Sequence, residues 1–279
     1  MLRKDVKACV LRIEGTNCEQ ETHDCIRRLG ANAEIVHLKQ LIGAGIRAER
    51  RRRLGDYHML VIPGGFSAGD YVRAGAIFAA RMKAALETEI KGFVEAGYPV
   101  LGICNGFQVL VEIGLLPGID EVMSSFPRAV LNTNDSNRFE CRPTFLMNEN
   151  SGKCVFTQLL PRGKVVMFPS AHAEGKLMFP AENEDKIVKR LSEKDQIVFK
   201  YVDPTGNYAD YPWCPNGSTA GIAGICNSMG NVMGLMPHPE RAFFKFLSPD
   251  WTRKNDDPAS FGDGWAIFES ALRYIEKKW

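Results

Sequence analysis

The chain has 279 residues, with 35 basic and 33 acidic side chains and a formal net charge of +2. This balance argues against a general attraction to nucleic acids or to membrane surfaces. Residues 1–10 carry charges where a secretory signal needs an apolar run, and no stretch approaches the ~18 apolar residues of a membrane helix. We therefore expect a cytoplasmic protein, folded as a single domain over residues 1–279 because no repeat or linker interrupts the chain.

Eight cysteines are spread along the chain, and none forms a Cys-x-x-Cys pair. A structural zinc site needs close pairs of cysteine or histidine, and a secreted disulfide scaffold is smaller and denser in cysteine. We expect most of these cysteines to be reduced core residues, and we expect neither a metal nor a cofactor in this chain.

The first half of the chain alternates short apolar runs with helical patterns. Thr16-Asn17-Cys18-Glu19 has the spacing of a capping box, which predicts a helix that stops at Gly30. The predicted elements, in chain order, are strands over 8–13, 33–38, 58–62 and 99–103, with helices over 16–30 and 76–96. Strands separated by helices indicate an α/β fold with an open, mostly parallel sheet and helices on both faces. Ligands bind such sheets beyond the carboxyl ends of the strands.

The second half is richer in strand patterns and ends in a helix. The strands are predicted over 139–147, 165–168, 197–202, 221–227 and 232–236, and the closing helix over 264–278. A separate run of arginines comprises Arg47 and residues 50–53. Because the total charge is balanced, we interpret this run as a solvated helix face or a protein contact.

A cysteine between two glycines follows the strand predicted over 99–103, in Gly102-Ile103-Cys104-Asn105-Gly106. The Gly-x-Cys-x-Gly spacing is the thiol form of a nucleophile elbow, a strand-to-helix turn so sharp that the flanking side chains must be nearly absent. The helix that follows directs free amides and its positive dipole end at the sulfur, which favours a thiolate. An inert buried cysteine is the alternative interpretation.

A thiol nucleophile needs a base, and His238 is the strongest candidate among the five histidines. It lies in Met236-Pro237-His238-Pro239-Glu240-Arg241, directly after an apolar strand, and the two prolines fix the backbone around it. Glu240 is close enough along the chain to accept the other imidazole N–H and to set the tautomer. The alternative is an exposed loop in which Glu240 forms only a salt bridge.

A glycine-rich segment, Gly64-Gly65-Phe66-Ser67, follows the strand predicted over 58–62. Adjacent glycines permit unusual backbone angles and close approach, so this loop can aim N–H groups at an oxyanion beside Cys104. Together with the amide of Asn105, these N–H groups predict an oxyanion hole. Adjacent glycines also occur in many ordinary turns.

These segments together resemble the class I, triad-type glutamine amidotransferases, a family with a flavodoxin-like fold. The similarity extends further, to the glutaminase subunits of phosphoribosylformylglycinamidine synthases. The matching segments are residues 63–71, 102–108, 136–139, 171–175, 215–218 and 236–241. Phe107 and the Asn216-Gly217-Ser218 segment make this resemblance more specific than the general amidotransferase pattern.

The resemblance implies that Cys104, His238 and Glu240 form a catalytic triad. Cys104 would attack the side-chain amide of glutamine, and a γ-glutamyl thioester would form as ammonia leaves. The ammonia would pass to a separate synthetase subunit in purine biosynthesis, and a small third subunit would bridge the two. ATP and magnesium would belong to the synthetase, not to this chain.

The resemblance also implies residues that hold glutamine. Oxyanion or substrate contacts are expected from Gly65, Phe66, Ser67, Asn105 and Gln108, the last lying one helical turn beyond Cys104. The backbone of Asn137, Arg138 and Phe139 matches a strand that lines the glutamine pocket. His172 and Glu174 match a family segment, and we expect them to be synthetase-facing or structural.

The chain departs from the compact family form over 43–55 and 244–262, which are expanded, and Ala68 stands where a bulkier residue is common. These departures concern the docking surface and the oxyanion loop. Two alternatives remain open. The chain is either another triad enzyme, such as a γ-glutamyl hydrolase or an amidotransferase for a different synthetase, or a non-catalytic scaffold subunit.

Overall fold

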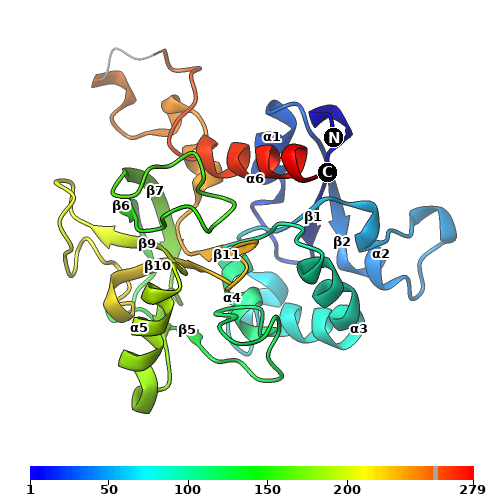
Figure 1. Ribbon diagram of the computed structural model, residues 1–279, viewed down its shortest axis with the longest axis horizontal. Coiled ribbons are helices and arrows are strands. Elements are labelled where there is room, and N and C mark those ends of the chain that lie inside the picture. The colour runs from blue at the N-terminus through cyan, green and yellow to red at the C-terminus, as the bar shows by residue number, and fades with distance from the viewer. Residues whose placement is uncertain (254–256) are drawn as a thin grey trace.

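The computed structural model describes residues 1–253 and 257–279, and it contains a central sheet flanked by helices (Figure 1). The strands are β1 (Lys7–Arg12), β2 (Asn32–His37), β3 (Met59–Ile62), β4 (Val100–Ile103), β5 (Val130–Asn132), β6 (Glu140–Asn148), β7 (Val165–His172), β8 (Lys176–Met178), β9 (Ile197–Val202), β10 (Ile222–Cys226) and β11 (Val232–Leu235). The helices are α1 (Glu19–Arg28), α2 (Leu38–Ile42), α3 (Ala76–Glu95), α4 (Asn105–Glu112), α5 (Glu184–Glu193) and α6 (Trp265–Lys278).

The main sheet has the order β2-β1-β3-β4-β11-β10-β9-β6-β7. Strands β2, β1, β3, β4 and β11 pair in parallel, which is the flavodoxin-like order. Helices α1 and α6 lie on one side of this parallel half, and α3 and α4 lie on the other (Figure 1). The α/β fold expected from the sequence is confirmed. The residues predicted to form the site after β3, β4 and β11 lie at the carboxyl ends of these neighbouring parallel strands.

An antiparallel half, formed by β10, β9, β6 and β7, extends the sheet. The strand predicted over 165–168 is longer and continues through Pro169 to His172. Prolines are tolerated here because Pro143 and Pro169 face each other across the β6–β7 pair, and β7 is an edge strand. The sheet curls so that β7 contacts the turn after β11.

The start of α1 differs from the sequence prediction. Cys18, not Thr16, occupies the N-cap position, and no side chain caps the helix there. The hydroxyl of Thr16 instead accepts a hydrogen bond from the backbone N–H of Ile13 at 3.2 Å. The predicted capping box is therefore wrong, because Thr16 closes the turn that leaves β1.

The structure also contradicts one of the two interpretations of the arginine run, the solvated helix face. Residues 47–53 do not lie on an α-helix; they form a loop with a single 3-10 turn over Ala48–Arg50. Arg52 pairs with Glu34 on β2 at 2.7 Å, and Arg47, Arg50, Arg51 and Arg53 are exposed. The solvated-helix interpretation is therefore wrong, whereas a protein contact stays a prediction.

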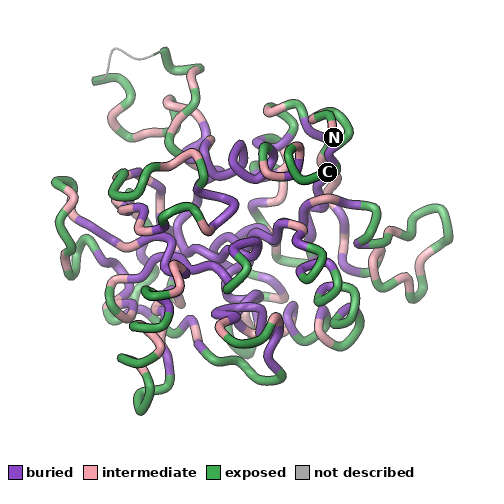
Figure 2. Tube along the Cα trace, in the orientation of Figure 1, coloured by how far each residue is buried: buried purple, intermediate pink, exposed green. Residues whose placement is uncertain are grey.

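Buried apolar residues form one contiguous cluster that extends over both halves of the sheet. Figure 2 shows the buried segments at the centre of the molecule and the exposed segments on the outer loops. Among the described residues, no helix is both long and apolar enough to span a membrane.

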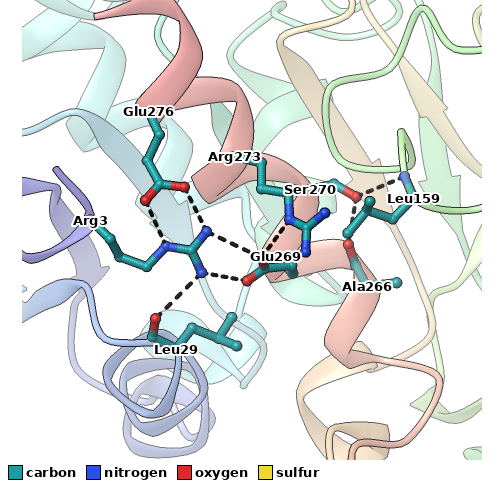
Figure 3. A network of polar contacts seen from close by, with 8 residues as sticks. All are labelled: Arg3, Leu29, Leu159, Ala266, Glu269, Ser270, Arg273 and Glu276. Atoms are coloured by element: carbon teal, nitrogen blue, oxygen red, sulfur yellow. Dashed lines mark hydrogen bonds and ion pairs between the residues drawn. The ribbon is translucent and has the colours of Figure 1, made fainter. Parts of the chain in front are cut away.

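A polar network joins the two ends of the chain (Figure 3). The guanidinium of Arg3 donates hydrogen bonds to Glu269 and Glu276, both on α6, at 2.5–3.1 Å. Arg273 also donates to Glu269, at 2.6 Å. The hydroxyl of Ser270, the residue next to Glu269 on α6, accepts a hydrogen bond from the backbone N–H of Leu159 at 3.2 Å. These contacts fix α6 against the N-terminal segment and against the 159 loop.

Candidate active site

Cys104 occupies the turn between β4 and α4, with φ +52° and ψ −108°. The flanking glycines are required by contact: a Cβ on Gly102 would lie 2.6 Å from the carbonyl oxygen of Gly106, and one on Gly106 would lie 1.8 Å from that of Ile62. The thiol is 6% exposed and lies 3.6 Å from the carbonyl oxygen of Ala171 on β7. The predicted elbow is present, and its strained backbone places the sulfur just beyond the carboxyl end of β4.

His238 and Glu240 lie in the turn after β11 and are 2% and 3% exposed. Nδ1 of His238 is 2.6 Å from Oε1 of Glu240, and the backbone N–H of His238 donates to the carbonyl oxygen of Pro169 at 2.8 Å. Burial alone would lower the pKa of His238, but Glu240 and Cys104 outweigh it and raise this pKa well above its ordinary value. The imidazolium is therefore the favoured form. The predicted exposed-loop alternative for Glu240 is wrong, since its carboxylate is buried.

Gly64 lies between the nucleophile and the base. A Cβ at this position would meet Cε1 of His238 at 2.7 Å and Cβ of Cys104 at 3.4 Å. Both side chains thus pack against the same glycine. Nε2 of His238 has no hydrogen-bond partner among the described residues, so it is free to exchange a proton with a group in the site.

Hydrogen bonds within the loop after β3 reduce the number of N–H groups that are available as oxyanion donors. The N–H of Phe66 donates to the carbonyl oxygen of Gly15 at 2.8 Å, and that of Ser67 donates to Oδ1 of Asn105 at 3.3 Å. The hydrogen bonds of the described residues leave the N–H groups of Gly65 and Asn105 unused. The Phe66 amide is therefore not an oxyanion donor in this conformation, because an antiparallel bridge between Thr16 and Gly65 occupies it.

Gln108 belongs to a chain of hydrogen bonds behind the elbow. Its Oε1 accepts from Nδ2 of Asn105 at 2.9 Å, and its Nε2 donates to the carbonyl oxygen of Glu174 at 2.6 Å. The carboxylate of Glu174 accepts from the N–H of Ala74 at 3.0 Å. Gln108 is 4% exposed, so its expected contact with substrate stays a prediction.

Asn137, Arg138 and Phe139 form a turn before β6, and the predicted strand character of these residues is wrong. Asn137 adopts a left-handed φ of +56°, and the side chain of Asn134 holds the turn by donating to the carbonyl oxygen of Arg138 at 3.0 Å. The rings of Phe66 and Phe139 lie 6.2 Å apart. The structure therefore brings this turn close to the loop after β3, and the expected contact of its backbone with glutamine stays a prediction.

Cys18 is a neighbour of the triad that no motif signals. Its sulfur lies 4.0 Å from Nδ1 of His238 and accepts a hydrogen bond from the Arg241 guanidinium at 3.1 Å. In the described part of the chain, Cys18, His238 and Glu240 form a group that could hold a metal ion, because one possible ligand atom of each lies within 4.8 Å of the other two. The same atoms make the His238–Glu240 hydrogen bond, so a metal here would compete with it.

Comparison with known proteins assigns a family. The family model described as a CobB/CobQ-like glutamine amidotransferase domain matches residues 5–275. The chain belongs to this family. Its relatives include the protein of Archaeoglobus fulgidus named phosphoribosylformylglycinamidine synthase subunit PurQ, 55% identical over 99% of this chain and 100% of that protein. The PurQ protein of Pyrococcus horikoshii is 40% identical over 98% of this chain and 100% of its own length.

Solved structures agree with the family assignment. A chain in the structure of PurLQS from Thermotoga maritima has 31% identity and a TM-score of 0.71, and the match covers 97% of this chain and 99% of that one. A glutamine amidotransferase from the same organism, with 18% identity and a TM-score of 0.51, shows likeness of fold. The fold, inferred from the alternation of strands and helices, and the family and enzymatic nature, inferred from the matching segments, are therefore confirmed.

Proposed function

We propose that this chain is the glutaminase subunit of a phosphoribosylformylglycinamidine synthase, which hydrolyses glutamine to glutamate and supplies ammonia for purine biosynthesis. The observation that carries the proposal is the buried His238–Glu240 pair beside the Cys104 elbow, in a chain 55% identical to a PurQ protein over nearly its full length. A non-catalytic scaffold has no need of a nucleophile, a base and an orienting carboxylate held in one site.

The first half of the proposed reaction forms a thioester. The Cys104 thiolate attacks the side-chain amide carbon of glutamine, and the N–H groups of Gly65 and Asn105 stabilise the oxyanion that develops. His238, held as an imidazolium by Glu240, gives its Nε2 proton to the departing nitrogen. Ammonia leaves, and the γ-glutamyl group remains on the sulfur of Cys104.

The second half regenerates the enzyme. Neutral His238 now accepts a proton from water, and the resulting hydroxide attacks the thioester carbon. The C–S bond breaks, glutamate is released, and the thiolate and imidazolium are restored. One water is consumed for each glutamine, so the atoms of glutamate and ammonia balance.

The partners of this chain follow from the same proposal. A separate ATP- and magnesium-using synthetase subunit receives the ammonia, and a small third subunit bridges the two. The PurLQS assembly that contains the Thermotoga maritima neighbour supports a multi-subunit complex. We place the complex in the cytoplasm, and we assign no cofactor to this chain.

The decisive experiment replaces Cys104 with alanine in the assembled complex. We expect Cys104→Ala to abolish synthesis from glutamine while synthesis from added ammonia continues, because only the glutaminase half is lost. Retained use of glutamine would overturn the mechanism. A glutamine-analogue electrophile should label Cys104 in the wild-type chain, and mass spectrometry that finds the label on another cysteine would move the site.

A free-standing γ-glutamyl hydrolase is distinguished by its need for a partner. A subunit of this kind should hydrolyse glutamine slowly alone and faster once the synthetase and its nucleotide are added. Full glutaminase rate in the isolated chain, with no stimulation by the synthetase, would contradict the subunit assignment.

A further inference from the structure

His172, the last residue of β7, lies beside the triad but belongs to none of the groups assigned above. The strand places the carbonyl oxygen of Ala171 3.6 Å from the sulfur of Cys104. The side chain of His172 is 3% exposed, so it does not form an outer docking surface. The synthetase-facing interpretation of His172 is therefore wrong in this structure. Its buried imidazole must have a role inside the chain.

The hydrogen bonds of Asn134 fix the tautomer of His172. Nδ2 of Asn134 donates to the carbonyl oxygens of Arg138 and His172, at 3.0 and 2.8 Å. Its Oδ1 is therefore the acceptor for the Gly175 N–H at 3.0 Å and for Nδ1 of His172 at 3.2 Å. Nδ1 must carry a ring proton to make that bond.

The other ring nitrogen of His172 is a lone-pair acceptor. Nε2 is buried, and the described residues offer it no hydrogen-bond partner. Burial, with the charge of His238 nearby, lowers the pKa of His172 to about 3, so the ring is neutral at neutral pH. The ring is also packed tightly, because a Cβ on Gly175 would lie 2.4 Å from Nδ1. An acceptor held this firmly and left unpaired is costly unless a donor reaches it.

We propose that Nε2 of His172 accepts a hydrogen bond from the side-chain nitrogen of glutamine, the atom that leaves as ammonia. The inference rests on the proposed glutaminase function. Among the N–H donors of glutamine, the reacting amide is favoured because His172 directly follows Ala171, whose carbonyl oxygen lies 3.6 Å from the sulfur of Cys104. Since Nε2 carries no proton, it can hold ammonia without converting it to ammonium.

A pair of variants separates this role from a structural one. In His172→Asn, the amide replaces the Nδ1–H donor to Asn134, but no atom remains at the position of Nε2. In His172→Gln, an acceptor oxygen reaches the position of Nε2, and the donor to Asn134 is lost. The proposal predicts that His172→Asn is the more damaging change for glutamate formation, and a structural role predicts the reverse order.

The measurement is kcat/KM for glutamate formation by the assembled complex, with ammonia-dependent synthesis and thermal unfolding as controls for folding. We expect about a tenfold loss for His172→Asn, the size of one lost hydrogen bond, and a smaller loss for His172→Gln. Ammonia-dependent synthesis should stay unchanged in both. The reverse order, or no loss in His172→Asn, would overturn the proposal.

A substrate without the leaving N–H tests which donor is bound. L-glutamate γ-methyl ester releases methanol, so the loss caused by His172→Asn should disappear with this ester. An equal loss with glutamine and with the ester would place the contact elsewhere and would also overturn the proposal. A wild-type complex that forms no glutamate from glutamine would instead contradict the proposed function itself.

Discussion

Nδ1 of His238 donates its proton to Oε1 of Glu240 across 2.6 Å, with both side chains buried. This hydrogen bond orients the ring and leaves Nε2 as the nitrogen that faces the chemistry. Because burial opposes the charged ring, the imidazolium depends chiefly on the negative charge of Glu240, which raises the pKa of His238.

We expect Glu240→Gln to lower kcat for glutamate formation by about 10²–10⁴-fold, the range typical of a lost acid–base contribution. The neutral amide no longer stabilises the imidazolium, and its NH₂ group favours the wrong tautomer. Steady-state glutamate release by the complex measures the effect. Glu21→Gln is the matched control, since Glu21 is an exposed carboxylate that pairs with Arg241 of the same turn at 3.2 Å. A comparable loss in both variants would argue against a specific role for Glu240.

The oxyanion loop depends on a glycine at position 65. Gly65 has a φ of +150°, and a Cβ there would lie 2.6 Å from the backbone nitrogen of Asn17. We expect Gly65→Ala to displace the loop and to lower kcat/KM for glutamine by about 10²-fold, the loss typical of one oxyanion donor. Synthesis from ammonia should be retained.

Gly45→Ala is the control for backbone strain alone. Gly45 also has a positive φ, +70°, but nothing lies within 4 Å of a Cβ built there. It should lower stability by about 1 kcal/mol and leave glutamate formation unchanged. If Gly45→Ala reduced glutamate formation as strongly as Gly65→Ala, general strain would explain both variants.

The polar network around Arg3 is expected to contribute to stability rather than to activity (Figure 3). We expect Arg3→Ala to lower the free energy of unfolding by about 1–3 kcal/mol, because it leaves the buried carboxylate of Glu269 with Arg273 alone. Denaturant unfolding monitored by circular dichroism provides the value. Arg190→Ala, which removes an exposed pair with Asp120, should cost no more than about 1 kcal/mol. Equal costs would show that burial of the network adds nothing.

Because the pKa of His172 is lowered in the folded chain, we expect the free energy of unfolding to depend on pH. Its pKa is about 3 in the folded chain and has an ordinary value of 6.5, so between these values the unfolded state binds more protons. The free energy of unfolding contributed by His172 is therefore fully present above pH 6.5 and is lost as the pH falls toward 3. Replacing His172 with glutamine removes this titration.

Unfolding curves at several pH values check that prediction. The difference between wild-type and His172→Gln stability should shrink steadily from pH 7 to pH 4, while it stays constant above pH 7. A difference that does not change with pH would mean that His172 titrates alike in the folded and unfolded states.

The sequence by itself determined the parts of this site that depend on neighbouring residues. Gly102 and Gly106 must lack side chains for the Cys104 turn to close, and the prolines around His238 set the local path that brings Glu240 to its ring. Each of these constraints acts over a few residues, so it leaves a readable spacing. The alternating strands and helices of the parallel half were predictable for the same reason.

Only the tertiary structure decided which backbone and side-chain groups complete the site. The choice between the Gly65 and Phe66 amides depends on a hydrogen bond from Phe66 to Gly15, a residue on a different loop. The positions of Cys18 and His172 depend on how α1 and the curled edge strand β7 meet the turn after β11. These contacts join residues far apart in the chain, so no local spacing encodes them, and they exist only once the sheet has folded around its core.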